Sequence, residues 1–160
     1  MNTTALRLAA ATLAALALAG AAACSDPSDE DLDLPTNDDI AALFTEWNDA
    51  LATGNPETVA ALYAPDAVLI PTVSNVVRTD HAGIVDYFTG FLPSRPSAVI
   101  EQSTINVLDA DNAIDTGTYR FTLHQAQGPE TVDARFTFVY QRRDDQWLIV
   151  NHHSSEMPEP

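Results

Sequence analysis

The sequence contains no lysine and little positive charge of any kind. Its seven basic residues are all arginine, and they stand against 23 aspartates and glutamates, which gives this chain of 160 residues a net charge of −16. Binding to nucleic acid requires clustered positive charge, because the phosphate backbone is a dense array of negative charge. We therefore expect neither nucleic acid nor an anionic membrane surface as a partner.

Cysteine is almost absent as well, since Cys24 is the only one. A single cysteine excludes an internal disulfide framework and a redox-active cysteine pair. The chain also lacks the glycine-rich fingerprint of dinucleotide-binding proteins and the G-x-S-x-G motif of a nucleophile elbow. The sequence thus predicts no cofactor and no serine nucleophile of that kind.

The histidines do not form a metal-binding pattern. His152 and His153 are adjacent on a predicted strand, so their side chains point to opposite faces and cannot bind one metal ion together. His81 and His124 are not spaced to complete a site with either of them. No metal site is predicted.

Residues 1–23 have the pattern of an export signal. Arg7 precedes a run of small and apolar residues, 8–23, that is too short and too rich in alanine for a stable membrane span. The stretch AGAAACSD resembles a bacterial lipobox, in which the cysteine, here Cys24, is lipidated and becomes the new N-terminus. The alternative is an ordinary secretory signal cleaved nearby. We favour an exported lipoprotein of the cell envelope, which meets a membrane only through its lipid anchor, because the cysteine lies where the composition changes.

Residues 24–37 are predicted to be an acidic tether. The segment has few apolar residues and many aspartates. Such a segment cannot bury enough surface to offset the conformational entropy that ordering would remove. We therefore expect the folded domain to begin at residue 38.

Residues 38–158 are predicted to form one α+β domain, in which three N-terminal helices pack on a curved, mainly antiparallel sheet. Thr36 or Asn37 is placed to cap the first helix, and Gly54 to end it. Apolar residues also recur at helical spacing in two later stretches, which predict the second and third helices. This spacing disappears after the sequence LPSRPS. Beyond it, residues typical of strands alternate with turn residues and predict strands at 98–108, 113–124, 131–143 and 147–154.

The hairpins of this sheet predict which side chains share a face. A turn centred on Gln127-Gly128 places Arg120 opposite Arg135, and a two-residue turn at Asp144-Asp145 continues that face onto the last strand. One face is then expected to carry Arg120, Arg135, Thr137, His152 and Ser154, and the other Tyr119, Phe121, Phe136, Phe138, Tyr140, Trp147, Ile149 and His153.

Two opposed arginines need compensation. Like charges that face each other across a sheet repel by roughly 0.2–1 kcal/mol where they are exposed. Asp133 lies on the same predicted face and could neutralise both Arg120 and Arg135. An anionic ligand is the other possibility, because paired guanidinium groups suit a carboxylate. The sequence leaves both open.

Four stretches carry a family resemblance: LYAPDAVLIPTVSNVVRT, YFTGF, TGTYRFTL and ARFTFVYQRRDDQWLIVNHHSSEMP. They resemble a bacterial branch of the nuclear transport factor 2-like (SnoaL-like) superfamily. More narrowly, they resemble the association domain of calcium/calmodulin-dependent protein kinase II and the SgcJ/EcaC-like proteins. The resemblance implies a cone in which a curved sheet wraps over helices around an internal pocket. It also implies a dimer or larger ring formed through the outer sheet face.

The resemblance further implies where a ligand binds. In the association domain, the arginine of the stretch matching TYRF points into a pocket for small carboxylates, and that residue is Arg120 here. A second pocket arginine falls near Phe138 and is absent, so Arg135 is the candidate to replace it. Because the cone interior is the expected site, the predicted ligand-pocket residues are Arg120, Arg135, Thr137, His152 and Trp47.

Two classes of function remain. The first is a non-catalytic domain that dimerises and holds a small anionic or amphipathic molecule. The second is an enzyme that isomerises, cyclises or dehydrates a small molecule by acid–base chemistry, with His152, Asp133 and Glu101 as candidate groups. Binding is favoured, because no pair of catalytic groups is fixed by its spacing.

The aromatic face bears on self-association. If the arginine face packs on the helices, the aromatic face is left uncovered, and it is larger than a monomer normally exposes. A second copy of the chain is the simplest cover. We therefore expect a homodimer or a larger oligomer.

Overall fold

The computed structural model describes residues 34–158. The predicted export signal at 1–23, the lipidation site at Cys24 and most of the predicted tether lie outside these residues. Among the residues described, no helix is both long and apolar enough to cross a membrane.

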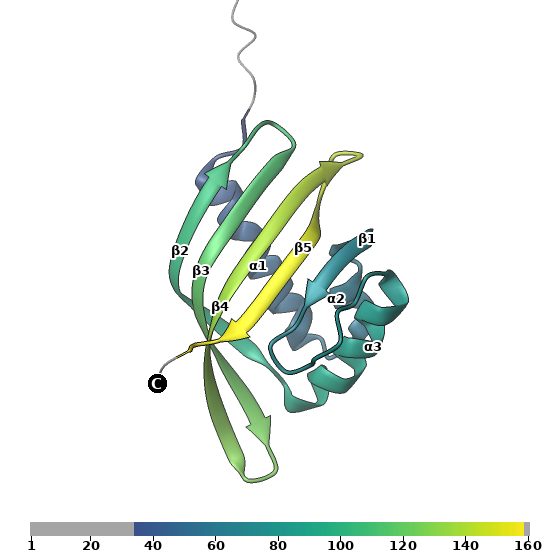
Figure 1. Ribbon diagram of the computed structural model, residues 1–160, viewed down its shortest axis with the longest axis vertical. Helices are drawn as coiled ribbons and strands as arrows, with labels where there is room; N and C mark the ends of the chain where they lie inside the picture. Colours follow the sequence, from purple (N-terminus) through teal and green to yellow (C-terminus); the bar gives the residue numbers. More distant parts are fainter. Residues whose placement is uncertain (1–33, 159–160) are drawn as a thin grey trace, which may run out of the picture. The chain divides into compact units, whose positions relative to one another are not determined.

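The described residues form an α+β domain, as predicted, with helices packed on a five-stranded sheet of order β1-β5-β4-β3-β2 (Figure 1). The first strand pairs in parallel with the last, and the other neighbours are antiparallel. The helices are α1 (Asn37–Ala52), α2 (Pro56–Ala60) and α3 (His81–Phe91), followed by the short 3-10 turn η1 (Leu92–Ser94). The strands are β1 (Tyr63–Ile70), β2 (Ser97–Val107), β3 (Asn112–Gln125), β4 (Gly128–Arg143) and β5 (Gln146–Glu156).

Helix α1 begins with a reciprocal cap. The Asp39 backbone N–H donates to Thr36 Oγ1 at 3.2 Å, and the Thr36 backbone N–H donates to Asp39 Oδ2 at 2.8 Å. This capping box satisfies two of the free N–H groups at the start of the helix and lowers the pKa of Asp39. Of the two predicted caps, the structure therefore uses Thr36. The buried side of α1 consists of Ile40, Phe44, Trp47, Ala50 and Leu51.

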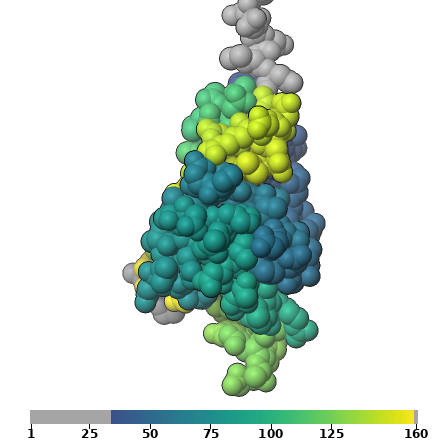
Figure 2. Space-filling model, turned by 90° about the vertical axis from the view of Figure 1, so that its right-hand side faces the viewer, coloured from purple at the N-terminus to yellow at the C-terminus, as the bar shows by residue number. Residues whose placement is uncertain are grey.

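Helix α3 is placed by a cap at its start and an apolar side. Asp80 Oδ1 accepts a hydrogen bond from the Gly83 backbone N–H at 2.7 Å, and Ile84 and Phe88 are buried. In Figure 1, α1 crosses behind the strands, while α2 and α3 lie beside β1. Figure 2 shows the side covered by α3 and the loop before it, drawn in teal. The helices therefore cover one face of the sheet, the inner face.

The inner face is the aromatic one. Phe136, Phe138 and Tyr140 are at most 4% exposed, and Phe138 lies 5.4 Å from Trp47 between ring centres. The expectation that the aromatic face lies outside and needs a second copy as cover is wrong, because helices of the same chain cover it. The arginine face is the outer one.

The β3–β4 hairpin has a different register from the one predicted. Gln125 pairs with Gly128, so the turn residues are Ala126 and Gln127, and Arg120 lies opposite Asp133. The predicted pairing of Arg120 with Arg135 is wrong by two residues. Gly128 does not occupy the centre of the turn but begins β4 with a φ of +123°, a conformation open mainly to glycine.

The last strand contains a bulge that reverses its faces. The turn at Asp144 and Asp145 is the two-residue turn predicted, with φ of 51° and 62°, and Tyr140 pairs with Ile149. The next pair is Val139 with Asn151, so Val150 is an extra residue. An extra residue shifts every later side chain to the other face. His152 and Ser154 therefore lie on the inner aromatic face, and His153 on the outer face, which corrects the predicted assignment of all three.

A close approach of β2 and β3 accompanies a second irregularity. The pairing of β2 shifts between Ile100 and Gln102, next to Gly117 on β3. A Cβ added at Gly117 would lie 1.8 Å from the backbone oxygen of Gln102. Only glycine allows the strands to come this close, and the shift brings Glu101 to the outer face beside Arg120.

Candidate ligand-binding site

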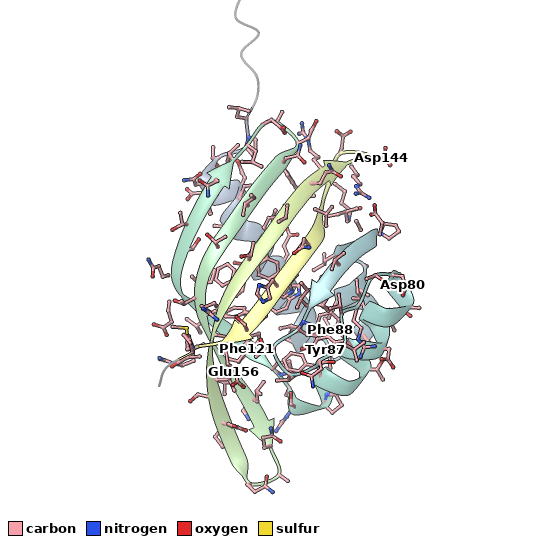
Figure 3. All side chains as sticks on the ribbon, in the orientation of Figure 1. Asp80, Tyr87, Phe88, Phe121, Asp144 and Glu156 are labelled. Carbon is pink, nitrogen blue, oxygen red and sulfur yellow. The ribbon has the colours of Figure 1, made fainter. Side chains whose placement is uncertain are left out.

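An internal cavity lies between α3, the loop after β1 and the inner face of the sheet. Its volume is about 20 Å³, which is room for about one water molecule. Figure 3 labels three residues of its wall: Tyr87 and Phe88, which project from α3 toward the sheet, and Phe121 on β3. The full lining consists of Trp47, Leu69, Pro71, Thr72, Tyr87, Phe88, Phe91, Tyr119, Phe121, His152 and Ser154.

Three buried polar groups are linked in a chain at this cavity. Trp47 Nε1–H donates to Tyr63 Oη at 3.0 Å, and Tyr63 Oη lies 2.9 Å from His152 Nδ1. Tyr63 Oη already accepts from Trp47, so we assign its own proton to the bond with His152 Nδ1. A neutral imidazole that accepts at Nδ1 carries its proton on Nε2.

Burial keeps the imidazole of His152 uncharged. Removal from water disfavours the imidazolium and, with a smaller effect from nearby His153, lowers the pKa of His152 to about 3. Burial also raises the pKa of Tyr63 well above its usual value. At neutral pH the three linked side chains, Trp47, Tyr63 and His152, are therefore all uncharged and interact through hydrogen bonds.

The Nε2–H of His152 has no acceptor. The atom is buried, and no described side chain or backbone group bonds to it. A buried donor left unpaired costs about 1–3 kcal/mol. His152 also borders the cavity, so a ligand that enlarges this space comes within reach of the N–H.

Aromatic neighbours fix the orientation of that donor. The His152 ring stacks on Phe138 with centres 4.0 Å apart and meets the ring of Trp47 edge-on at 5.3 Å. Both contacts are favourable ring geometries, and the bond to Tyr63 holds a third side. The imidazole therefore cannot turn freely to find another partner.

A second set of hydroxyls closes the wall of the cavity. Tyr119 Oη donates to Ser154 Oγ at 2.6 Å, and Thr72 Oγ1 is hydrogen-bonded to the same Ser154 hydroxyl. These bonds attach the loop after β1 to β5 and β3. Burial raises the pKa of Tyr119, so this hydroxyl is also uncharged.

The predicted site residues fall into two groups. Trp47 and His152 lie together at the internal cavity. Arg120, Arg135 and Thr137 lie on the outer face and do not line it. The prediction that two guanidinium groups meet inside the cone is therefore wrong, because the aromatic side chains occupy the inner positions of these strands.

The outer arginines are engaged in different ways. Arg120 Nε bonds to Asp133 Oδ1 at 2.6 Å, and Arg120 Nη1 lies 3.1 Å from Glu101 Oε1. The sequence left open whether Asp133 or an anionic ligand balances the charge of Arg120, and the structure shows Asp133. Arg135 does not share Asp133, and its Nη2 donates to Ser155 Oγ at 3.3 Å. The candidate catalytic carboxylates Asp133 and Glu101 are thus separated from His152 by the thickness of the sheet.

Sequence reasoning missed the partner of His152. Tyr63 was not among the predicted site residues, yet it begins β1 and its hydroxyl bonds to His152. A signal was present, since a buried tyrosine or tryptophan usually finds a hydrogen-bond partner. Nothing in the sequence indicates that the partner of Trp47 is Tyr63, which lies 16 positions further along the chain. Within residues 34–158, no group of three or more His, Cys, Asp or Glu side chains is placed to hold a metal ion.

Comparison with known proteins now defines the class. A family model described as the calcium/calmodulin dependent protein kinase II association domain matches residues 36–158. A solved candidate association domain of this kind from Xanthomonas campestris is 56% identical, covers 76% of this chain and 87% of that chain, and has a TM-score of 0.75. The chain therefore belongs to the calcium/calmodulin-dependent protein kinase II association-domain family. Membership implies oligomerisation in general terms.

More distant structures share the fold. A nuclear transport factor 2-like protein from Novosphingobium aromaticivorans is 12% identical, covers 77% of this chain and 82% of that chain, and has a TM-score of 0.64. A candidate scytalone dehydratase from the same organism is 14% identical, covers 74% and 81%, and has a TM-score of 0.65. These likenesses confirm the predicted fold. Among curated proteins, no match to the chain was found.

Proposed function

We propose that this protein is an exported, lipid-anchored, dimeric domain whose internal cavity binds a small amphipathic molecule without transforming it. The observation that carries the binding proposal is the Nε2–H of His152, a buried donor without an acceptor on a residue that borders the cavity. A ligand oxygen of the ketone, ether or ester type satisfies this donor. The aromatic wall then packs against the apolar part of the ligand.

The chemistry of the wall favours an uncharged group inside the cavity. No charged side chain is among the described residues that line it, and His152 is neutral. A carboxylate in these surroundings would lose its hydration without gaining a cation. Of the two ligand types that the sequence suggested, the amphipathic one therefore fits the interior.

The cavity must open to admit such a ligand. Its volume of about 20 Å³ is far below that of pockets that hold drug-sized molecules, roughly 300–1,000 Å³. Tyr87 and Phe91 form its wall toward solvent and are only partly buried. Rotation of these two side chains is the smallest change that enlarges the site.

The alternative, an enzyme of the SnoaL-like type, is less well supported. Acid–base catalysis works best with a group that titrates near the working pH. Burial moves the pKa of His152 down to about 3 and that of Tyr63 far upward, away from neutrality on both sides. The carboxylates of Asp133 and Glu101 lie on the other face of the sheet.

The outer face supports the proposal of a dimer. It is polar, rich in threonine, and carries a shallow hollow at its centre around Gln102, Thr116, Arg135 and His153. A second copy can cover such a face with hydrogen bonds. Sedimentation analysis at micromolar concentration tests this, and a stable monomer would contradict it.

Lipid anchoring is tested separately. We expect a labelled fatty-acid analogue to be incorporated into the wild-type protein in a bacterial host and not into Cys24→Ser. Unlabelled, secreted wild-type protein would instead indicate the ordinary secretory signal.

Ligand binding is tested with two molecules of the same shape. Acetophenone carries a carbonyl oxygen where α-methylstyrene carries a methylene, so only the first can accept from His152. Titration followed by Trp47 fluorescence should show acetophenone binding about tenfold more tightly, the effect of one hydrogen bond. In His152→Phe the two affinities should become equal. Binding of neither molecule, or equal binding to the wild type, contradicts the proposal.

A further inference from the structure

A second hollow lies directly outside the internal cavity. This outer groove has a volume of about 560 Å³ and is bordered by Val73, Ser74, Arg78, Asp86, Tyr87 and Phe91, with the end of β3 on its far side. It lies where α3 and the loop before it meet the β3–β4 hairpin, which extends beyond the other strands in Figure 1.

The groove and the cavity share a wall. Tyr87 and Phe91 border both, and the flanking walls continue from Thr72 to Val73 on the loop. The two rings are one helical turn apart on α3 and stack with centres 5.5 Å apart. They therefore form a thin partition, and a change of side-chain rotamer alone joins the two spaces.

One cation faces the groove. Arg78 is held in place by its backbone, which exchanges two hydrogen bonds with Leu69, of 2.8 and 2.9 Å. Its guanidinium Nη1 bonds to Asp86 Oδ2 at 2.6 Å. The Arg78 side chain is only 19% exposed, and it is the least exposed arginine among the ion pairs of the described residues.

The guanidinium of Arg78 is incompletely satisfied. Its Nε is buried and has no hydrogen-bond partner. A desolvated guanidinium with an unused donor favours a further anion, because its five N–H groups are arranged for bidentate contact with a carboxylate. Asp86 does not fill this role. It is 71% exposed, and exposed ion pairs contribute only about 0–1 kcal/mol, so a second carboxylate can share or replace it.

We propose that the outer groove binds the anionic head group of the ligand, with a carboxylate on Arg78 and the apolar remainder passing between Tyr87 and Phe91 into the internal cavity. The predicted ligand class is therefore a linear carboxylate whose apolar remainder also carries the ketone, ether or ester oxygen that accepts from His152. This inference rests on the proposed binding function, and it adds the head group, its position and the direction in which the ligand lies.

The head group is tested with matched ligands. ω-Benzoylalkanoates with two to eight methylene groups, which carry a ketone next to the ring, are compared with the alcohols of the same length, by calorimetric titration against the full-length wild-type protein. We expect at least one carboxylate to bind about tenfold more tightly than its alcohol. If both series bind equally, the internal cavity binds ligands but the inference is overturned. If neither series binds, the proposed function fails as well.

Variants then locate the charge. In Arg78→Gln, the roughly tenfold preference for the carboxylate over the alcohol of the same length should disappear. Asp86→Asn should strengthen carboxylate binding, because it removes the competing acid. Arg143→Gln is the control, since it also removes one charge and one ion pair, with Asp66, at the opposite end of β4. Loss of both ligand series in Arg78→Gln, or an equal loss of preference in Arg143→Gln, would contradict the assignment. Thermal unfolding of each variant confirms that it is folded.

Discussion

The two faces of one sheet show how differently the same strands can be used. On the inner face, aromatic rings and hydroxyls are buried under the helices, and His152 is held neutral by desolvation. On the outer face, Arg120 bonds to Asp133 and Glu101 in contact with solvent. Consecutive residues such as Thr137 and Phe138 belong to different faces because their side chains point in opposite directions. A polar group therefore acts as a hydrogen-bonding element on the inside and as part of an ion pair on the outside.

The largest expected difference between the two faces is in how a fall in pH changes the free energy of unfolding. His152 has a pKa of about 3 in the folded protein, against 6.5 in the unfolded chain, so the unfolded chain takes up the proton first as the pH falls. The contribution of neutral His152 to the free energy of unfolding is thus fully present above pH 6.5. It is lost as the pH falls toward 3, and the loss is roughly 4–5 kcal/mol. Urea unfolding at several pH values measures this loss, and His152→Phe should remove it.

The adjacent histidine is the control for this effect. His153 is exposed on the outer face, so His153→Phe should leave the acid-dependent loss of stability in place. An equal effect of the two substitutions would mean that the bulge at Val150 does not separate them.

The next effect compares packing at adjacent positions of β4. Phe138 is fully buried, and Phe138→Ala should lower the free energy of unfolding by about 3–5 kcal/mol, because the cavity it leaves is lined by rings that cannot collapse. Thr137→Ala, on the outer face, should change it by less than about 0.5 kcal/mol. Chemical denaturation of both variants measures the difference, and similar values would contradict the assignment of the faces.

The smallest expected difference in stability comes from replacing one carboxylate on each face, Asp115 inside and Asp133 outside. Asp115 is fully buried on the inner face, and burial raises its pKa, although a 2.5 Å bond from Ser103 Oγ opposes the shift. The folded protein therefore binds this proton more tightly. The stabilisation is complete below the ordinary pKa of 3.8 and is lost as the pH rises through the folded value.

Asp115→Asn should remove this dependence and stabilise the protein at neutral pH by about 1 kcal/mol. Asp115 Oδ2 is buried without a partner, and the substitution removes the charge from that position. On the outer face, Asp133→Asn should act in the opposite direction by less than about 1 kcal/mol, since it removes a solvated ion pair. Thermal unfolding at pH 4 and pH 7 distinguishes these outcomes.

Much of the fold followed from local patterns. The cap at Thr36 and the stop at Gly54 were enough to place the first helix. The turn at Asp144-Asp145 was correct because adjacent residues with positive φ suit a tight hairpin. The aromatic alternation on β3 and β4 was also correct. The errors were the choice of which face packs on the helices, the register of the β3–β4 hairpin and the faces of the last strand beyond Val150.

The site was harder to predict because it depends on single-residue irregularities. An extra residue at Val150 has no signal in a strand that is apolar at successive positions, yet it moves His152 from one face to the other. The Gln127-Gly128 dipeptide suggested a turn, but Gly128 is needed where the strand begins. The unpaired Nε2 of His152 and Nε of Arg78 are properties of the packed chain, and no pattern of residue types contains them.

The strand order also has a consequence for how the domain is assembled. The last strand lies between the first and the fourth, and Leu69 pairs with His152. During synthesis β1 therefore has no place to dock until β5 has been made, so the sheet closes late and through contacts between distant parts of the chain. A shortened carboxyl end would leave the earliest strand without its neighbour β5 in the sheet and would open the core beneath it.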